Sequence, residues 1–186
     1  MKSPLTTPVA ACIAAATALG ISPLGQCAVS QSGAPAQQLL RTQTAFDIVV
    51  SLPYAEAAPL FGPEGERPWA GKHWDPQFLH PQPAHDEQGA VFTIRHGSVA
   101  AVWVNTLFDL EAHHFQYAYF IPDIMVTTID VRFTPTGTRS TGVHVVYTRT
   151  ALTPEGNDHV TAFTATDKTA AQDWQKAIDA YLASRK

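Results

Sequence analysis

Six stretches between positions 42 and 152 are rich in β-branched and aromatic residues, and the first of them alternates between apolar and other residues, as strands that bury one face do. The first stretch is TQTAFDIVVSL at residues 42–52, where Phe46, Ile48 and Val50 share a face and Pro53 follows. The other five come later in the chain at about ten-residue spacing, and they are VFTIRHG, VAAVWVNTLFD, HFQYAYFIP, IMVTTIDVRFTP and TGVHVVYTRTAL. Turn residues separate them, so the pattern predicts an antiparallel meander.

Helical patterns lie on either side of this meander. Residues 54–60 contain YAEAA between two prolines, which predicts a short helix that starts after Pro53 and stops at Pro59. Near the end of the chain the period lengthens, and four apolar residues recur at helical spacing: Trp174, Ile178, Tyr181 and Leu182. The spacing predicts a C-terminal helix within residues 154–181. The threonine-rich stretch TATDKT leaves open whether this is one helix or two.

The order of these elements predicts an α+β protein of the helix-grip type. In that architecture a curved antiparallel sheet, here of about six strands, wraps around a long C-terminal helix, and residues 41–186 form the domain. A strongly twisted sheet and a single helix do not fill the space between them with side chains alone. The sequence therefore predicts a cavity between the sheet and the last helix.

Residues 1–30 have the profile of a secretory signal peptide. They contain one lysine, no acidic residue and an apolar, alanine-rich run. A membrane anchor is the alternative, but this run is shorter than the roughly 20 residues that a spanning helix needs. We therefore expect a signal peptide, and a mature protein that is periplasmic or secreted and has no stable membrane anchor.

Small residues that suit signal cleavage end at Ser30, and a second such group ends at Ala36. A lipoprotein attached at Cys27 is less well supported, because Gln26 occupies the preceding position, where a small residue is expected. The polar residues 31–40 then form a flexible lead-in to the domain.

Composition and motifs exclude several classes of function. The 12 Lys and Arg residues are balanced by 16 Asp and Glu residues, without a basic cluster, so we expect no nucleic-acid partner. Both cysteines lie in the predicted signal peptide, which leaves no disulfide or thiol nucleophile in the mature chain. His73 and His80 lack the spacing of a metal site, and the chain has no G-x-S-x-G or phosphate-binding loop. We expect no metal and no cofactor.

The segment FGPEGERPWAGKHWDPQFLHP, between the first helix and the meander, is dense in proline, glycine and tryptophan. One interpretation is structural, with prolines and glycines setting the turns. In this interpretation Arg67 pairs with Glu64 or Glu66. Asp75 then caps a short helix at residues 76–79.

A functional interpretation of the same segment uses its two indoles, Trp69 and Trp74, as a lid over a bound ligand. A catalytic interpretation takes one of its acids as a general base, namely Glu64, Glu66 or Asp75. The spacing of these acids does not by itself fix a catalytic geometry.

Two strands supply inward rows of side chains that face the last helix. These rows are Phe115, Tyr117, Tyr119 and Ile121 on one strand and Met125, Thr127, Ile129, Val131 and Phe133 on the next. Such rows are commonly plain core, but inward hydroxyl groups need partners, which a ligand can provide. We predict that the ligand-binding side chains are Trp69, Trp74, Phe92, Trp103, Tyr117, Tyr119, Thr127 and Ile129.

Several quoted motifs resemble a bacterial branch of the SRPBCC superfamily of START-like and polyketide-cyclase-like proteins. They are LFGPEGERPWA, WDP with a proline-rich end, YTRTALTPEGNDHV and DWQKAIDAYL, and the resemblance covers most of residues 42–184. It implies a helix-grip fold with a hydrophobic pocket. The superfamily includes lipid carriers, hormone binders and aromatase/cyclases.

The sequence and the resemblance together give three hypotheses of function. The first is an exported protein that binds a hydrophobic or amphipathic small molecule, lipid-like or aromatic, in an internal cavity. The second is a cyclase-like or hydratase-like enzyme that acts on a polyketide-like substrate with Glu66, Asp75, Tyr117 or Tyr119. The third is a structural module whose own side chains fill the cavity.

Overall fold

The computed structural model describes residues 38–96 and 99–186. The predicted signal peptide at residues 1–30, and residues 31–37 of the predicted lead-in, lie outside the described residues. Within the part of the chain that is described, no helix is long and apolar enough to cross a bilayer.

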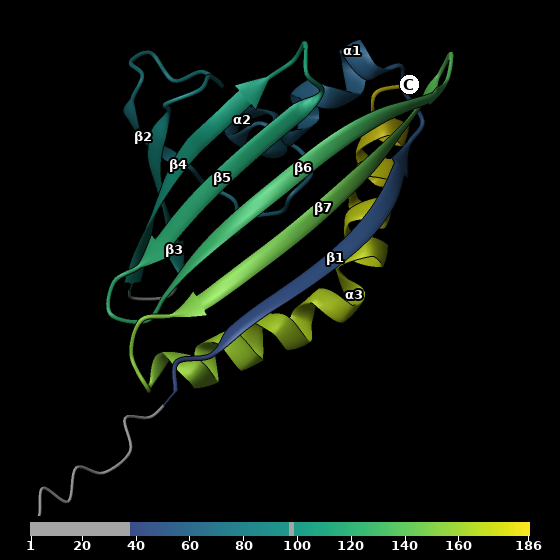
Figure 1. Cartoon of the computed structure of the whole chain (residues 1–186). Coiled ribbons are helices and arrows are strands. Elements are labelled where there is room, and N and C mark those ends of the chain that lie inside the picture. Colours follow the sequence, from purple (N-terminus) through teal and green to yellow (C-terminus); the bar gives the residue numbers. More distant parts are fainter. Residues whose placement is uncertain (1–37, 97–98) are drawn as a thin grey trace, which may run out of the picture. The chain divides into compact units, whose positions relative to one another are not determined.

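One antiparallel sheet of seven strands forms the body of the domain, in the order β1-β7-β6-β5-β4-β3-β2. The five-strand meander that the sequence predicts is confirmed, and β1 pairs with the last strand, β7. The strands are β1 Arg41–Val50, β2 Gln77–His80, β3 Val91–His96, β4 Val99–Asp109, β5 His114–Ile121, β6 Met125–Gly137 and β7 Ser140–Ala151. Figure 1 shows this sheet with α3 along one side.

Strand β2 is the additional strand, and it corrects the helix predicted at residues 76–79. Residues 77–80 instead pair with β3. Asp75 therefore has no helix to cap. Its carboxylate accepts a hydrogen bond of 2.9 Å from Arg67 instead. The backbone of this segment finds its partners in the sheet, which leaves no reason for a helical turn.

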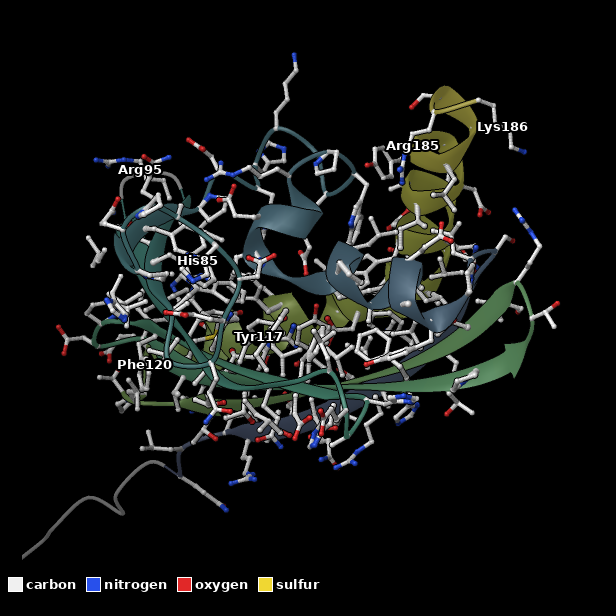
Figure 2. The ribbon with its side chains drawn as sticks, turned by 90° about the horizontal axis from the view of Figure 1, so that it is seen from above. His85, Arg95, Tyr117, Phe120, Arg185 and Lys186 are labelled. Atoms are coloured by element: carbon white, nitrogen blue, oxygen red, sulfur yellow. The ribbon has the colours of Figure 1, made fainter. Side chains whose placement is uncertain are left out.

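All the helices lie on one face of the sheet (Figure 2). They are α1 Tyr54–Ala57, the 3-10 helix η1 Ala58–Phe61, α2 Pro63–Glu66 and α3 Gly156–Ser184. Pro59 does not stop the first helical segment as predicted, because the chain tightens into η1 and continues to Phe61. Gly65 lets α2 approach η1, since a Cβ at this position would lie 1.7 Å from the Pro59 carbonyl oxygen.

The C-terminal helix is a single helix of 29 residues, which answers the question that the threonine-rich stretch left open. Threonine hydroxyls along this helix donate hydrogen bonds back to carbonyls of the preceding turn, as Thr161 does to Asn157 and Thr164 does to Val160. Such bonds satisfy the hydroxyls and favour bending of the helix. Figure 1 shows α3 changing direction near its middle, so that it follows the edge of the sheet.

The inward rows predicted on β5 and β6 are buried, from Phe115 through Ile121 and from Met125 through Phe133. At the end of the sheet near α1, Phe61 packs edge-to-face on Phe133 with ring centroids 5.3 Å apart. Phe133 in turn packs on Phe115 at 4.9 Å. These rings fill the space between the sheet and α3 at this end, so the cavity lies elsewhere.

Helix α3 is held along the edge strand β1 by side chains that replace a neighbouring strand. The Val49 backbone N–H donates to Gln175 Oε1 at 3.0 Å, and Gln175 Nε2 donates to the Val49 carbonyl at 2.9 Å. Further along, the hydroxyls of Thr42 and Thr164 lie 2.8 Å apart. These bonds cover the open edge of β1 and fix the position of the helix that forms one wall of the cavity.

Candidate functional site

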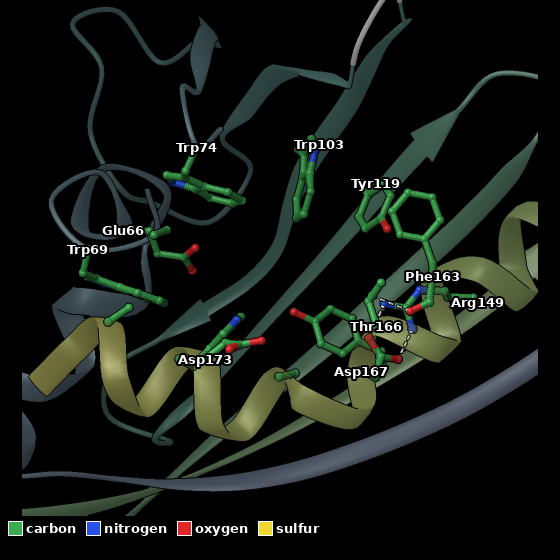
Figure 3. A pocket seen from close by; sticks show the side chains of 15 residues that line it. Glu66, Trp69, Trp74, Trp103, Tyr119, Arg149, Phe163, Thr166, Asp167 and Asp173 are labelled. Atoms are coloured by element: carbon green, nitrogen blue, oxygen red, sulfur yellow. Dashed lines mark hydrogen bonds and ion pairs between the residues drawn. The ribbon is translucent and has the colours of Figure 1, made fainter. Parts of the chain in front are cut away.

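A cavity of about 440 Å³ lies between α2 with the loop after it, the inner face of the sheet and α3 (Figure 3). We call it the outer cavity, because it reaches the surface at the exposed residues Thr166 and Asp173. Its volume falls in the range of small-molecule sites. All four tryptophans of the chain are among its lining residues, and the aromatic lining consists of Trp69, Trp74, Trp103, Trp174, Tyr119, Tyr147 and Phe163.

A second cavity of about 40 Å³ lies deeper under the sheet. This inner cavity shares a partition with the outer one, made of Glu66, Trp74, Trp103, Tyr147 and Trp174. Its volume suits a few water molecules at most. The hollow predicted between sheet and helix therefore exists, but the volume for a ligand lies at its mouth, because aromatic side chains fill most of the interior.

Six of the eight residues predicted to bind a ligand line these cavities. Trp69 and Tyr119 line the outer cavity, Tyr117 and Ile129 line the inner one, and Trp74 and Trp103 line both. Contact of these side chains with a ligand stays a prediction.

The other two predicted residues, Phe92 and Thr127, line neither cavity. Phe92 is fully buried and stacks behind the ring of Trp103, with centroids 5.8 Å apart. Thr127 is fully buried in the row on β6, and its hydroxyl has no hydrogen-bond partner in the described part of the chain. Both residues therefore belong to the core behind the cavity wall.

The indoles from the α2 segment are fixed by their own N–H groups. Trp69 Nε1 donates to the Leu60 carbonyl at 2.7 Å, and Trp74 Nε1 donates to the Pro63 carbonyl at 2.8 Å. These bonds use the polar end of each ring and leave its apolar body for the cavity. Trp103 differs, because its buried Nε1 has no hydrogen-bond partner among the described residues.

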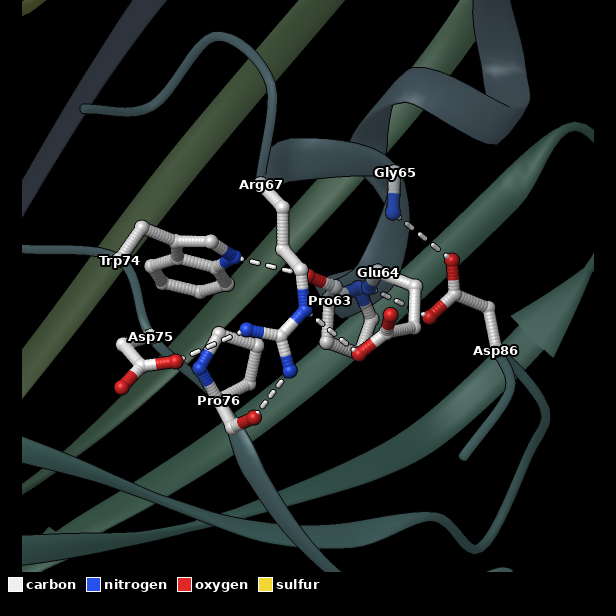
Figure 4. A network of polar contacts seen from close by, with 8 residues as sticks. All are labelled: Pro63, Glu64, Gly65, Arg67, Trp74, Asp75, Pro76 and Asp86. Atoms are coloured by element: carbon white, nitrogen blue, oxygen red, sulfur yellow. Dashed lines mark hydrogen bonds and ion pairs between the residues drawn. The ribbon is translucent and has the colours of Figure 1, made fainter. Parts of the chain in front are cut away.

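A polar network holds the same segment from outside (Figure 4). The Arg67 guanidinium donates to Glu64 at 2.8 Å and to Asp75 at 2.9 Å, and it also reaches the Pro76 carbonyl. Pairing of Arg67 with Glu64 matches one of the predicted alternatives, and Glu66 is not its partner. Asp75 is exposed and lines neither cavity, so it does not join the other candidate acids.

Asp86 holds the start of α2 by accepting hydrogen bonds from the backbone N–H groups of Glu64 and Gly65, at 2.8 and 3.2 Å. Burial raises the pKa of the Asp86 carboxyl, and these two hydrogen bonds oppose that change. Sequence reasoning missed Asp86, because it lies in a polar break 20 positions after Glu66. The bonds place Glu66 on the inner side of α2.

Glu66 is the buried acid of the site. It is 8% exposed, and it lines both cavities. Its carboxyl makes no hydrogen bond or ion pair within the described part of the chain. Burial raises the pKa of this carboxyl well above its ordinary value, and the nearby Asp86 raises it further. Glu66 therefore keeps its proton to higher pH than an exposed glutamate.

Two tyrosines lie next to this acid. The Tyr117 hydroxyl donates to the Phe61 carbonyl at 2.5 Å, and burial followed by the nearby Glu66 raises its pKa well above the ordinary value. Burial and Glu66 also raise the pKa of Tyr147, which lines both cavities. Both hydroxyls thus stay protonated; the Tyr117 donor is used by the Phe61 carbonyl, while the Tyr147 hydroxyl can act as a neutral hydrogen-bond donor.

A buried ion pair closes the far end of the outer cavity (Figure 3). Arg149 on β7 donates to Asp167 on α3 at 2.5 and 2.9 Å, and the two side chains are 4% and 7% exposed. The guanidinium lies over the Tyr147 ring, 4.6 Å from its centroid. Sequence reasoning missed this pair, although the alternation along β7 places position 149 on the same inward face as Val143 and Val145.

The residues that the structure describes, 38–96 and 99–186, contain no group of three or more His, Cys, Asp or Glu side chains that could hold a metal ion. The polar groups of this aromatic cavity are the unpaired buried acid Glu66, two tyrosine hydroxyls and the buried ion pair of Arg149 with Asp167.

No protein-family model matches the sequence, and no curated protein matches it. Solved structures do share its fold. Norcoclaurine synthase from Thalictrum flavum, in complex with dopamine and hydroxybenzaldehyde, is 13% identical with a TM-score of 0.57, covering 80% of this chain and 90% of that one.

Two further solved structures share the fold. An uncharacterised protein from Rhizobium leguminosarum is 11% identical with a TM-score of 0.56, covering 76% of this chain and 97% of that one. The di-domain ARO/CYC BexL of the BE-7585A biosynthetic pathway is 12% identical with a TM-score of 0.55, covering 74% of this chain and 46% of that one. The chain therefore has the helix-grip fold that its resemblance to the SRPBCC superfamily implies.

Proposed function

We propose that this protein binds a small hydrophobic or amphipathic molecule with an aromatic portion in the outer cavity. The observation that carries the proposal is the concentration of all four tryptophans around one cavity of about 440 Å³. Indoles have large apolar surfaces and bury well against aromatic ligands. The norcoclaurine synthase structure of similar fold holds two small aromatic molecules, which is in line with this class of ligand.

Unpaired polar groups on the cavity wall support a ligand that is not purely apolar. Two lining residues, Trp103 and Arg149, each have a buried Nε–H without a partner among the described residues, and a buried donor without a partner costs about 1–3 kcal/mol. Because these N–H groups lie within the wall, an acceptor on the ligand or a water molecule would satisfy one of them only after a small movement of its side chain. With the predicted signal peptide, the proposal is for an exported binder, in the periplasm or secreted.

Acid–base catalysis on the bound molecule is the second candidate function, and Glu66 is the observation that favours it. A buried carboxyl with a raised pKa beside two tyrosine hydroxyls is the type of group that enzymes use as general acid or base. Of the acids named from the sequence, Glu66 alone faces the cavities, since Asp75 lies outside both and Glu64 pairs with Arg67.

The proposed function is tested by filling the outer cavity from α3. Ala170 lines it, and the change Ala170→Phe places a ring in the space for the ligand. We expect this variant to bind the neutral fluorescent probe N-phenyl-1-naphthylamine at least about tenfold more weakly than the wild type, which corresponds to about 1.4 kcal/mol. Fluorescence titration of the purified protein measures both affinities.

The matched control is Ala180→Phe, which adds the same ring to an exposed position of α3 that lines neither cavity. Its probe affinity should stay within about twofold of the wild type. Equal binding by the wild type and Ala170→Phe would place the probe elsewhere and contradict the proposal. Failure of the wild-type protein to bind the probe would also contradict it.

A further inference from the structure

Glu66 is an unpaired carboxyl, more than nine-tenths buried, in the wall of an aromatic cavity. Figure 3 shows its side chain between those of Trp69 and Trp74, directed into the cavity. Resting on the proposed function, we propose that the ligand carries a positive charge, as a protonated or quaternary amine, and that this group lies between the Glu66 carboxylate and the indole rings.

The charges around the outer cavity favour a cation over an anion. Its lining residues include three carboxyl groups, on Glu66, Asp167 and Asp173, and a single basic side chain, Arg149. The charge of Arg149 is already paired with Asp167 through two hydrogen bonds from its terminal nitrogens, although its buried Nε has no partner among the described residues. This leaves two acids, Glu66 and Asp173, without a positive partner, and a bound anion would find no free cation on the described wall.

The aromatic walls near Glu66 suit the same kind of ligand. Trp69 meets Trp174 with centroids 5.3 Å apart at 66°, and Trp74 meets Trp103 at 5.3 Å and 82°. Because the rings of each pair are steeply inclined, the indoles turn their faces in different directions around the cavity. A cation over an indole face is attracted by the electrons of the ring, most strongly where water is excluded.

Binding of a cation here should be coupled to the protonation of Glu66. Burial raises the pKa of the carboxyl in the free protein, whereas a neighbouring positive charge favours the ionised form. A cation should therefore bind more tightly as the pH rises through the raised pKa of Glu66, and less tightly below it. Other groups that face this acid are Asp86 beside α2, Tyr117 and Tyr119 on β5, Tyr147 and Arg149 on β7, and Asp167 and Asp173 on α3.

The test uses two probes of nearly equal shape, benzyltrimethylammonium and its neutral carbon isostere neopentylbenzene. The ammonium probe is charged at every pH, so any pH dependence belongs to the protein. Both are titrated as competitors of N-phenyl-1-naphthylamine on the wild type and on Glu66→Gln, between pH 5 and pH 8. The ratio of the two affinities is the readout, because it cancels any general change in affinity for apolar molecules.

We expect the wild type at pH 8 to prefer the cation by about tenfold, and the preference to fall as the pH is lowered. In Glu66→Gln the ratio should fall severalfold and become independent of pH between pH 5 and pH 8, because the carboxyl that titrates is gone while the indoles and Asp173 remain. The change Asp173→Asn, at the exposed acid, should reduce the ratio by less than Glu66→Gln does.

The possible failures can be told apart. If both competitors displace the fluorescent probe equally well, the charge preference is wrong while the proposed function stands. A cation preference that survives unchanged in Glu66→Gln also overturns the inference, since the carboxylate would not be its source. If the fluorescent probe itself does not bind the wild type, the proposed function fails and this inference fails with it.

Discussion

Replacing Asp167 with alanine is expected to lower the free energy of unfolding by about 3–5 kcal/mol. The change removes the partner of Arg149, whose side chain is 4% exposed and cannot turn to solvent without leaving its place in the cavity wall. It also removes the acceptor for the Thr44 hydroxyl, which links β1 to α3. Urea denaturation followed by tryptophan fluorescence measures the loss.

Two further variants identify the cause of that loss. The double change Arg149→Met with Asp167→Leu removes both charges and should recover most of the stability, because an apolar pair of similar volume needs no charged partner. The change Asp47→Ala, at an exposed pair with His144, should cost less than about 1 kcal/mol. A loss below about 1 kcal/mol in Asp167→Ala would show that the pair is not buried in solution.

Replacing Phe61 with alanine is also expected to lower the free energy of unfolding by about 3–5 kcal/mol. Here the cause is the cavity left by the missing ring, and not an unpaired charge. Phe61 is 1% exposed, and its ring contacts those of Trp69, Phe133 and Trp174. Its backbone carbonyl, which accepts the hydrogen bond from Tyr117, is kept in the variant. The measured effect should therefore report the loss of the ring, determined by the same denaturation.

Phe120→Ala is the matched control for this change. Phe120 lies on β5, where its neighbours Tyr119 and Ile121 point inward, but its own side chain is 43% exposed. The control should cost less than about 1 kcal/mol. Similar losses in both variants would contradict the placement of Phe61 at the centre of the packed end of the domain.

The fold could be predicted from the sequence to a large degree, because alternation with a period of two is a strong signal over long strands. The rows on β5 and β6 each bury their predicted face, since a shift of one residue would expose the whole row. Strand β2 gave no such signal, because it has four residues and one of its neighbours in sequence is a proline-rich turn. Its pairing depends on β3 and not on its own pattern.

The candidate site was predictable only where a side chain's direction follows from its own element. Trp103, Tyr117 and Tyr119 face inward because of the alternation along β4 and β5, and Trp174 was recognised only as part of the apolar face of α3. The pair of Arg149 and Asp167 joins two elements, and it depends on how far α3 is shifted along β1. That shift is set by tertiary contacts such as those of Gln175, which no local pattern contains.

The directions of the acids in and after α2 also could not be predicted from the sequence. Sequence reasoning named Glu64, Glu66 and Asp75 together, and the structure separates them by direction. Glu64 and Asp75 turn outward to Arg67, while Glu66 turns inward to the cavity. The close approach of Gly65 to Pro59 and the hydrogen bonds that the backbone N–H groups of Glu64 and Gly65 donate to Asp86 fix that direction.

The four indole N–H signals of a proton–nitrogen NMR spectrum test the central claim most directly, because every tryptophan of the chain lines the outer cavity. Addition of N-phenyl-1-naphthylamine should shift these signals, because the rings of all four tryptophans line the space that the probe fills. In Ala170→Phe the shifts should be lost at the same probe concentration. Binding of the probe that leaves all four indole signals of the wild type unchanged would contradict the account.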